Sequence, residues 1–362
     1  MASGKSVAIV GATGAVGLEF LTCLERRNFP VGRLRLLASA RSVGKTLTFR
    51  GESLPVEELK PESFKDVEIG LFSAGAAISR EYAPMAVKAG VTVVDNSSAF
   101  RMDPEVPLVV PEINPEDIRH HKGIIANPNC STIIALVPVY AIHRRNPVRR
   151  MIVATYQAAS GAGAKAMEEL RVQAADVLAG KPAVKKVFRH QIAFNLFSHN
   201  SKIAENGYNE EENKMVKETW KIFHDVTVKI SATCVRVPVF RAHSEAIWIE
   251  CERPVEEAQV REWLTGAPGL RVVDDREGNT FPMPIDASGE EDVLVGRIRR
   301  DYSRDDGRGI SLFVAGDQLL KGAALNAVQI AEILVNGAVA PNRASTGVVR
   351  LPFSPDTAVL PR

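Results

Sequence analysis

A glycine-rich loop directly after the first apolar strand is the feature that most constrains the fold of this chain. Residues 6–10 form a short β-branched run, residues 11–17 carry three glycines in the pattern G-x-x-G-x-x-G, and residues 18–27 have helical periodicity. The glycines permit a tight turn, close approach of the backbone to a pyrophosphate, and close packing of helix on strand. The pattern favours a nucleotide-binding strand, turn and helix over a plain structural turn.

The segments that follow continue the alternation of strands and helices, and beyond residue 148 the pattern of strands and helices changes. Strands at 34–38, 68–72 and 91–95 with a helix at 80–89 predict an α/β fold with a parallel sheet of the Rossmann type. Beyond residue 148 the pattern predicts a second, α+β domain. Its predicted strands are 149–156, 226–236 and 246–251, and its predicted helices are 164–178 and 211–222.

A last apolar helix, at 317–335, is expected to return to the nucleotide domain. We therefore predict a nucleotide-binding domain of residues 1–131 plus 317–340 and a second domain of residues 132–316. The proline-rich tail at 341–362 is expected to be a surface wrap or a disordered end. The mixed charges of 297–308 predict a solvated hairpin.

The turn after the second strand indicates which dinucleotide is bound. Residues 39–42 read Ser-Ala-Arg-Ser and lack the carboxylate with which NAD enzymes hold the ribose hydroxyls. A guanidinium and two hydroxyls suit a 2′-phosphate, so we predict NADP; the alternative is a solvated loop arginine. The residues expected to contact the cofactor are Gly11, Thr13, Gly14, Ala15, Val16, Gly17, Ser39, Arg41, Ser42, Ser73 and Gly75.

Cys130 lies between a polar turn and the apolar run 133–142. Ser131 and Thr132 are good N-caps, so the thiol is expected near the positive end of a helix dipole, which favours a thiolate. The alternative is a small buried residue at a helix start. Beside a nicotinamide, a thiolate that adds to an aldehyde creates a hydride donor and then a thioester. Water, coenzyme A or phosphate could each resolve that thioester.

Composition narrows the classes of partner. The net charge is +2 with both signs interleaved, so no extended field for nucleic acid or an anionic membrane is present. The four cysteines are far apart and form no C-x-x-C pair, which argues against a disulfide framework or a metal site and favours a reducing compartment. No apolar stretch is long enough to span a bilayer. We expect a soluble protein with a small-molecule ligand.

Nine motifs occur in an order that matches one enzyme family. They are GATGAVG from Gly11, LASARSVGK from Leu37, DNSSAFR ending at Arg101, NPNCST with Cys130, YQAASGAG with Gln157, NEEENKMVKET with Lys214, CVRVPVFRAHSE with Arg236 and His243, GRIRRD from Gly296, and DQLLKGAALNAVQIAE with Asn326. By these motifs the chain resembles the aspartate-semialdehyde dehydrogenases, up to about its final helix.

The resemblance implies the reaction and its setting. Members of this family interconvert L-aspartate 4-semialdehyde and L-4-aspartyl phosphate with NADP and inorganic phosphate, in lysine, threonine, methionine, isoleucine and diaminopimelate biosynthesis. It also implies a homodimer or homotetramer whose interface and catalytic groups come from the second domain. The expected compartment is the cytoplasm, or the plastid stroma if the source is a plant or an alga.

The resemblance also assigns roles to residues. Cys130 would be the nucleophile, His243 the general acid and base, and Gln157 the group that orients the reactants. Arg236 would bind the substrate carboxylate, Glu211 its ammonium group, Lys214, Arg101 and Asn129 the inorganic phosphate, and Ser160, Gly161 and Asn326 the nicotinamide. Without the motifs, His243 would read as a structural histidine, Arg236 as a buried ion pair, and Glu211 with Lys214 as a solvent-exposed pair.

The sequence leaves three other functions open. N-acetyl-γ-glutamyl-phosphate reductase has the same fold and cysteine chemistry, but an acetylated amine carries no charge for Glu211 to meet. A coenzyme A-acylating aldehyde dehydrogenase would resolve the thioester differently. A catalytically inactive nucleotide-binding regulatory protein would not need Cys130, Gln157 and His243 together.

Overall fold

The computed structural model describes residues 4–337 and divides them into two units. The first unit contains the residues up to Asn129 together with those from Ala323 onward, and the second is Cys130–Gly322. The predicted tail at 341–362 lies outside the described residues. Among the residues that the structure describes, no helix is long and apolar enough to cross a bilayer.

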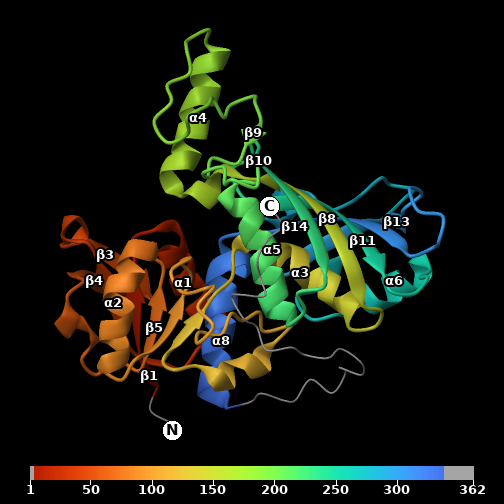
Figure 1. Ribbon diagram of the computed structural model, residues 1–362. Helices are drawn as coiled ribbons and strands as arrows, with labels where there is room; N and C mark the ends of the chain where they lie inside the picture. Colours follow the sequence, from red (N-terminus) through yellow and green to blue (C-terminus); the bar gives the residue numbers. More distant parts are fainter. Residues whose placement is uncertain (1–3, 338–362) are drawn as a thin grey trace. The chain divides into compact units, whose positions relative to one another are not determined.

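The first unit is built on a seven-stranded sheet with the order β3-β4-β2-β1-β5-β6-β7 (Figure 1). All neighbouring strands are parallel except the hairpin of β3 and β4. The strands are β1 (Lys5–Val10), β2 (Val31–Ala38), β3 (Thr46–Phe49), β4 (Glu52–Glu58), β5 (Ile69–Phe72), β6 (Thr92–Asp95) and β7 (Ile124–Ala126). The helices are α1 (Ala15–Arg26), α2 (Ala76–Lys88) and α8 (Leu325–Asn336).

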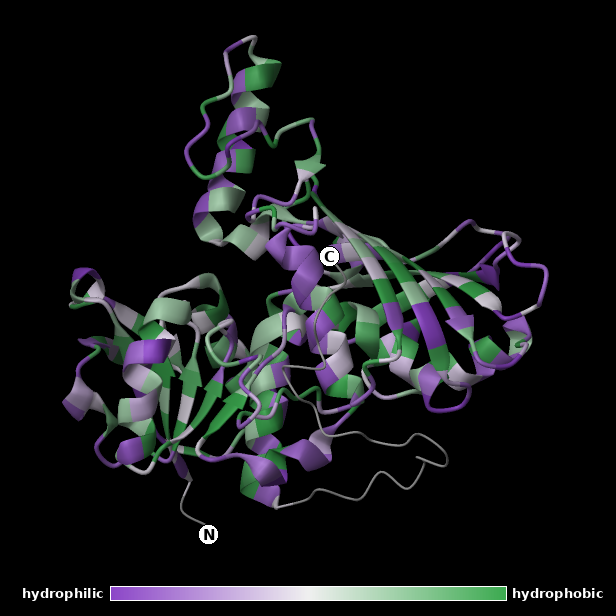
Figure 2. Ribbon diagram, viewed as in Figure 1, coloured by the Kyte–Doolittle hydropathy of each residue, from purple (hydrophilic) through white to green (hydrophobic). Residues whose placement is uncertain are grey.

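Continuous apolar runs explain this sheet. Residues 7–10 and 69–72 are buried throughout, as expected for parallel strands covered on both faces, and the strands of this sheet are mostly hydrophobic (green) in Figure 2. α8 packs against α1, β5 and β6, and Arg27 binds Glu332 through both carboxylate oxygens at 2.7 and 2.8 Å. The helix from the end of the chain therefore completes the nucleotide-binding unit.

Three helix starts differ from the predictions in this region, and the first is that of α2, which begins at Ala76 instead of residue 80. The helix expected at 18–27 begins at Ala15, so the third glycine of the loop lies inside the helix. The helix expected at 317–335 begins later, with a π turn at Leu320–Ala324 followed by α8. Asp317 stays outside because its carboxylate accepts hydrogen bonds from the backbone of Leu319 (2.9 Å) and Leu320 (3.3 Å).

The second unit contains a mixed seven-stranded sheet with the order β12-β13-β14-β11-β8-β10-β9. Its strands are β8 (Val148–Gln157), β9 (Phe197–Ser198), β10 (Lys229–Arg236), β11 (His243–Cys251), β12 (Leu270–Val272), β13 (Val293–Arg300) and β14 (Gly309–Gly316). Its helices are α3 (Cys130–His143), α4 (Ala164–Leu178), α5 (Glu210–Phe223), α6 (Glu257–Leu264) and α7 (Pro284–Ala287). The prediction of a second α+β domain is confirmed, and residues 297–308 do form the end of a hairpin.

Alternation along β8 and β11 separates the two faces of this sheet. On β8, Met151, Val153 and Thr155 are buried, while Arg150 and Tyr156 on the other face are exposed. Helix α3 packs against β8, β11, β13 and β14, and α5 packs against β10. Figure 2 shows the corresponding bands of hydrophobic and hydrophilic residues along these strands. The face under α3 and α5 carries several buried polar residues, among them Gln157.

Candidate active site

The glycine loop of the first unit leads from β1 into α1. Gly11 has a φ of 88°, and a Cβ there would lie 2.5 Å from the carbonyl oxygen of Ser73. A Cβ on Gly17 would lie 2.3 Å from the carbonyl oxygen of Gly11, so the helix packs directly on the loop. Gly14 precedes α1 without a side-chain cap. Because the first N–H groups of a helix lack intrahelical partners and attract anions, Gly14, Ala15 and Val16 fit a pyrophosphate.

A short 3-10 turn, Ala40–Ser42, follows β2 and carries the residues predicted to recognise the ribose. Ser39 and Arg41 are exposed, and the hydroxyl of Ser42 lies 3.2 Å from that of Thr13 in the glycine loop. This contact ties the turn to the loop. The turn contains no carboxylate, so its donors fit an additional phosphate on the ribose.

Arg101 and Asn129, which the family resemblance assigns to phosphate, are both buried in the first unit. The guanidinium of Arg101 donates to the carbonyl oxygens of Asn127 (2.9 Å) and Asn96 (2.8 Å). These two bonds fix its orientation. Lys214, the third residue assigned to phosphate, belongs to the second unit.

Asn326 and Gly75 are the remaining cofactor candidates of the first unit. The amide of Asn326 donates to the carbonyl oxygen of Val109 (3.0 Å) and to Oδ1 of Asn127 (2.7 Å), which holds α8 in place. Gly75 has a φ of 92° at the start of α2. A direct role for either residue at the nicotinamide or its crevice remains a prediction.

Cys130 is the first residue of α3, so Ser131 and Thr132 lie in the first turn of the helix and the prediction that they are its N-caps is wrong. Its side chain is partly exposed, whereas the other three cysteines are buried. A Cβ on Gly322 would lie 2.8 Å from the Cβ of Cys130, so only glycine lets the chain pass this closely. Burial raises the pKa of the Cys251 thiol to about 12, and also raises that of Cys234. Cys130 is therefore the cysteine best placed to react.

Strand register brings the other catalytic candidates together in the second unit. Arg236 ends β10 opposite Gln157, the last residue of β8, and His243 begins β11 one residue beyond the pair formed by Ser244 and Tyr156. All three side chains therefore lie at one edge of the sheet. The three residues come together because β8 and β10 end, and β11 begins, at matching positions in the sheet.

His243 is fully buried, and its tautomer follows from one contact. The backbone N–H of Ala158 donates to Nδ1 at 3.0 Å, so Nδ1 is an acceptor and the neutral ring carries its proton on Nε2. Burial lowers the pKa of His243 well below its usual value, and the charge of Arg236 acts in the same direction. Nε2 has no hydrogen-bond partner among the described residues. A Cβ on Gly161 would lie 3.0 Å from it, so the absence of a side chain at Gly161 leaves room beside this N–H.

Arg236 is 3% exposed and is held by three hydrogen bonds. Nη1 donates to the carbonyl oxygen of Ala158 (2.9 Å), Nε to Oδ1 of Asn200 (3.3 Å) and Nη2 to Nε2 of His199 (2.8 Å). Burial lowers the pKa of Arg236, and the attraction of Glu211 and then of Cys130 opposes this effect. The positive charge of the Arg236 guanidinium is therefore close enough to Cys130 to interact with a thiolate there.

Glu211 and Gln157 form a second polar pair on the same face. Gln157 donates through Nε2 to Oγ1 of Thr155 (3.2 Å) and to Oε1 of Glu211 (3.4 Å). Glu211 is buried at the start of α5, where Lys214 binds its other oxygen at 3.1 Å. The pair is therefore not the fully exposed ion pair that its helical spacing alone suggests.

Several polar residues around these groups escaped the sequence prediction. The amide of Gln318 donates to the hydroxyl of Ser160 and accepts from the backbone of Ala242 at 2.8 Å. Glu245 lies two residues after His243 on the same strand, and its carboxyl oxygens have no hydrogen-bond partner among residues 4–337. Burial raises the pKa of Glu245 well above its usual value, and Glu211 adds to this effect. For Glu245, the one feature of the sequence that could have identified it is its place two residues after His243, on the same face of the strand.

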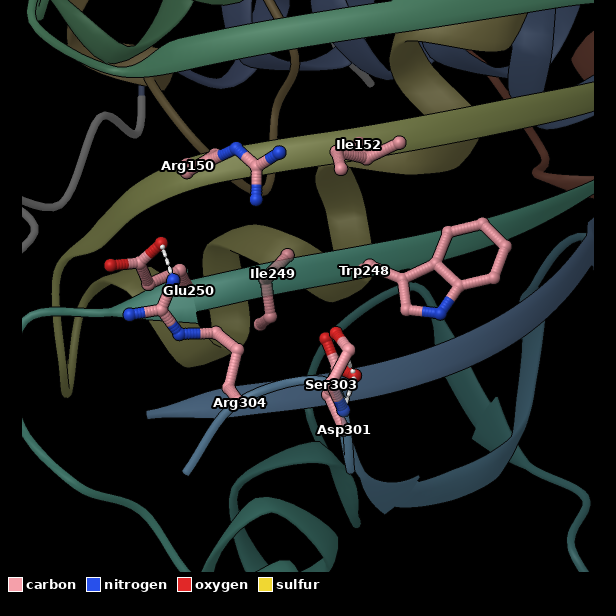
Figure 3. A pocket seen from close by; sticks show the side chains of 8 residues that line it. All are labelled: Arg150, Ile152, Trp248, Ile249, Glu250, Asp301, Ser303 and Arg304. Carbon is pink, nitrogen blue, oxygen red and sulfur yellow. Dashed lines mark hydrogen bonds and ion pairs between the residues drawn. The ribbon is translucent and has the colours of Figure 1, made fainter. Parts of the chain in front are cut away.

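A cavity of about 310 Å³ lies on the other face of the second sheet (Figure 3). Arg150 and Trp248 line it, and both point away from the face that carries Gln157 and His243 because they differ from those residues by an odd number of positions. Arg304, at the rim, binds Glu250 at 2.8 Å. This ion pair neutralises two of the charged side chains of the cavity, and the cavity lies on the opposite face of the sheet from α3, which carries the thiol.

Two family models match the chain. One, described as the NAD binding domain of semialdehyde dehydrogenase, matches residues 6–121, and the other, its dimerisation domain, matches residues 139–321. Their order agrees with the two units and confirms the predicted fold class.

Curated relatives and solved structures agree with these models. An aspartate-semialdehyde dehydrogenase from Synechocystis sp. is 55% identical over 92% of this chain and 98% of the relative. The crystal structure of aspartate semialdehyde dehydrogenase II from Vibrio cholerae, complexed with ASA, has a TM-score of 0.89 and 47% identity over 92% of this chain and 98% of that one. The enzyme from Candida albicans, crystallised with NADP, has a TM-score of 0.71 and 26% identity over 92% and 99% of the two chains.

Proposed function

The chain belongs to the aspartate-semialdehyde dehydrogenase family, and from this premise we propose that it interconverts L-aspartate 4-semialdehyde and L-4-aspartyl phosphate with NADP and inorganic phosphate. The observation that carries the proposal is the placement of a partly exposed thiol, Cys130, at a helix start, with a buried cation and a neutral imidazole on the same unit. The reaction belongs to amino-acid biosynthesis, and we place it in the cytoplasm. A plastid location would apply only to a plant or algal source.

In the oxidative direction the thiolate of Cys130 attacks the aldehyde carbon and forms a C–S bond. The carbonyl oxygen becomes an alkoxide, and the Nε2–H of His243 donates a hydrogen bond to it. When bound, NADP would supply the acceptor for the hydride of this carbon, and loss of the hydride would leave the acyl group on Cys130 as a thioester. An oxygen of inorganic phosphate then attacks the thioester carbon, the C–S bond breaks, and the thiolate of Cys130 is restored.

His243 serves this sequence as a donor that remains neutral at rest. Its Nδ1 already accepts the N–H of Ala158, so the ring cannot take up a second proton without losing that bond. This geometry supports a role of His243 as the general acid, which is one of its two predicted roles. Proton transfer from the thiol to His243 would require the Ala158 contact to break.

Charge separates the two anionic parts of the reaction. We assign the substrate carboxylate to Arg236 and its ammonium group to Glu211, and we assign inorganic phosphate to Arg101, Asn129 and Lys214. Gln157 would orient the reacting carbonyl from its position beside Glu211. Gly161, which lies beside His243, and Ser160, which precedes it, would face the nicotinamide.

Reduction of NADP by aspartate semialdehyde, followed at the absorbance of NADPH with and without inorganic phosphate, tests the proposal. We expect turnover only when phosphate is present, because phosphate must release the acyl group from Cys130. Equal rates without phosphate would indicate hydrolysis, and dependence on coenzyme A would indicate acyl transfer to a thiol. Faster turnover of N-acetyl-glutamate semialdehyde would favour the reductase alternative, which the buried anionic site at Glu211 disfavours.

A further inference from the structure

A chain of hydrogen bonds joins Arg236 to the start of α5 in the second unit. Nη2 of Arg236 contacts Nε2 of His199 at 2.8 Å, and Nδ1 of His199 lies 3.0 Å from the hydroxyl oxygen of Ser201. The backbone N–H of Glu211 donates to that same hydroxyl oxygen at 3.2 Å. His199 and Ser201 therefore bridge the arginine at the end of β10 and the glutamate at the start of α5.

The direction of each hydrogen bond follows from the donors. A guanidinium only donates, so Nε2 of His199 accepts, and in the neutral ring Nδ1 carries the proton and donates to Ser201. The backbone N–H of Ser201 also approaches Nδ1, at 3.2 Å. A backbone N–H can also only donate, but the contact with Arg236 is shorter and its donor is charged, so this stronger hydrogen bond determines the tautomer.

The surroundings keep His199 neutral. Burial lowers the pKa of His199 to about 4, with Glu211 acting against burial and the cations Arg236 and Lys214 acting with it. At neutral pH the ring is therefore available as an acceptor for Arg236. An imidazolium would lose that bond and repel the guanidinium.

The other contacts of Arg236 leave this role to His199. Ala158 and Asn200 hold Nη1 and Nε, and the ring of Phe188 lies 5.9 Å from the guanidinium carbon. None of these three reaches α5. Packing of α5 on β10 and the contact of Gln157 with Glu211 also join these elements, but the path through His199 and Ser201 reaches the guanidinium of Arg236 itself.

We propose that His199 is a positioning residue that fixes the guanidinium of Arg236 relative to Glu211, and so sets the separation of the groups that bind the carboxylate and the ammonium of the substrate. The role rests on the proposed function of Arg236 and Glu211. It makes His199 a determinant of specificity for an α-amino acid aldehyde. An aldehyde without the amine engages only the arginine and gains nothing from a fixed separation.

Steady-state kinetics with aspartate semialdehyde and with succinate semialdehyde, its analogue without the amine, test this role. The variants are His199→Leu, His199→Gln, Arg236→Lys and, as a matched control, His190→Leu, an exposed histidine of the same segment. In His199→Leu we expect KM for aspartate semialdehyde to rise about 10- to 100-fold, the range for one lost hydrogen bond to a charged group. We expect kcat to change by less than about threefold, because the thiol and His243 are untouched.

The remaining variants distinguish positioning from a purely structural role. His199→Gln should restore KM, since an amide oxygen can accept from Arg236 and its NH₂ can donate to Ser201. His199→Leu should also reduce the preference for aspartate semialdehyde over the analogue. His190→Leu should match the wild type in KM for aspartate semialdehyde and in the preference for it over the analogue.

Specific outcomes would overturn the role of His199. An unchanged KM in His199→Leu would do so, as would equal losses of kcat and thermal stability in His199→Leu and His199→Gln. An unchanged KM in Arg236→Lys would instead overturn the carboxylate role of Arg236. A raised KM in Arg236→Lys with an unchanged KM in His199→Leu would leave the proposed function standing and remove the bridge alone.

Discussion

Burial decides the protonation state of individual side chains in the second unit. His243 is held neutral, Glu245 is held protonated, and the thiols of Cys234 and Cys251 are held inactive by the cost of placing a charge away from water. Cys130 differs because it is partly exposed at a helix start. The reactive thiol is thus distinguished from its neighbours by environment.

Alkylation with iodoacetamide should modify Cys130 first and stop turnover. In Cys130→Ala we expect the rate to fall by about 10⁴-fold or more, because no other nucleophile replaces the thiolate, while NADP binding is retained. Mass spectrometry of the labelled peptide and NADP titration check both points. Cys251→Ala, which removes a buried thiol, is the control; retained activity in Cys130→Ala would contradict the covalent route.

Glu245 should make the stability of the protein depend on pH. Its folded pKa is raised, so the folded state keeps a proton that the unfolded state releases above about pH 4.5. This contribution is complete below that pH and is lost as pH rises, by up to about 1.4 kcal/mol per pH unit. Glu245→Gln should remove this slope in urea unfolding at pH 5–8.

Glu252, a partly exposed glutamate that pairs with Arg149 at the surface, provides the comparison, because Glu252→Gln should keep the slope of the wild type. The same slope in Glu245→Gln and the wild type would show that another group retains the proton.

At the scale of elements, helix starts were the hardest feature to predict. The apolar run 133–142 identified α3, but serine and threonine, although preferred at N-caps, also occur inside a first turn, so the start at Cys130 was missed. The hairpin of β3 and β4 was also missed. Its turn places Arg50 at a φ of 51° before Gly51, and arginine gives no signal for that conformation.

The short turn after β2 should control the choice of cofactor. In Arg41→Ala we expect KM for NADP to rise about 10- to 100-fold through loss of a charged contact with the 2′-phosphate, while KM for NAD stays unchanged. Arg33→Ala, which removes an exposed arginine of β2 itself, should leave both values unchanged. Unaltered discrimination in Arg41→Ala would place the phosphate contact elsewhere.

At the scale of the whole molecule, the sequence predicted two domains and most of the residues that gather in the second one. Arg236, Gln157 and His243 were identified from their motifs, and strand register explains why they meet. His199, Asn200 and Gln318 were not found, because isolated polar residues in loops carry no periodicity and acquire meaning only from tertiary contacts.

The outward face of the second sheet should form a homodimer interface, as the match to a dimerisation domain indicates. Tyr156 is 38% exposed there and packs against Phe313. Light scattering should give twice the chain mass of 39.4 kDa, and Tyr156→Glu should shift the protein toward monomer because it places a charge in an apolar contact. Tyr302→Glu, in the exposed loop of the hairpin, is the control.

Four times the chain mass would indicate a homotetramer. A mass in Tyr156→Glu equal to that of the wild type would place the interface elsewhere.

The chain leaves the first unit after Asn129 and re-enters it at Ala323. Asn127 donates to the carbonyl oxygen of Ala323 at 3.4 Å and accepts from Asn326 at 2.7 Å. These hydrogen bonds join the two chain segments that lead into and out of the second unit. The second unit is in effect an insert with neighbouring ends. Replacing residues 130–322 by a short glycine linker should yield a minimal dinucleotide carrier, since loop closure over so small a gap costs little entropy.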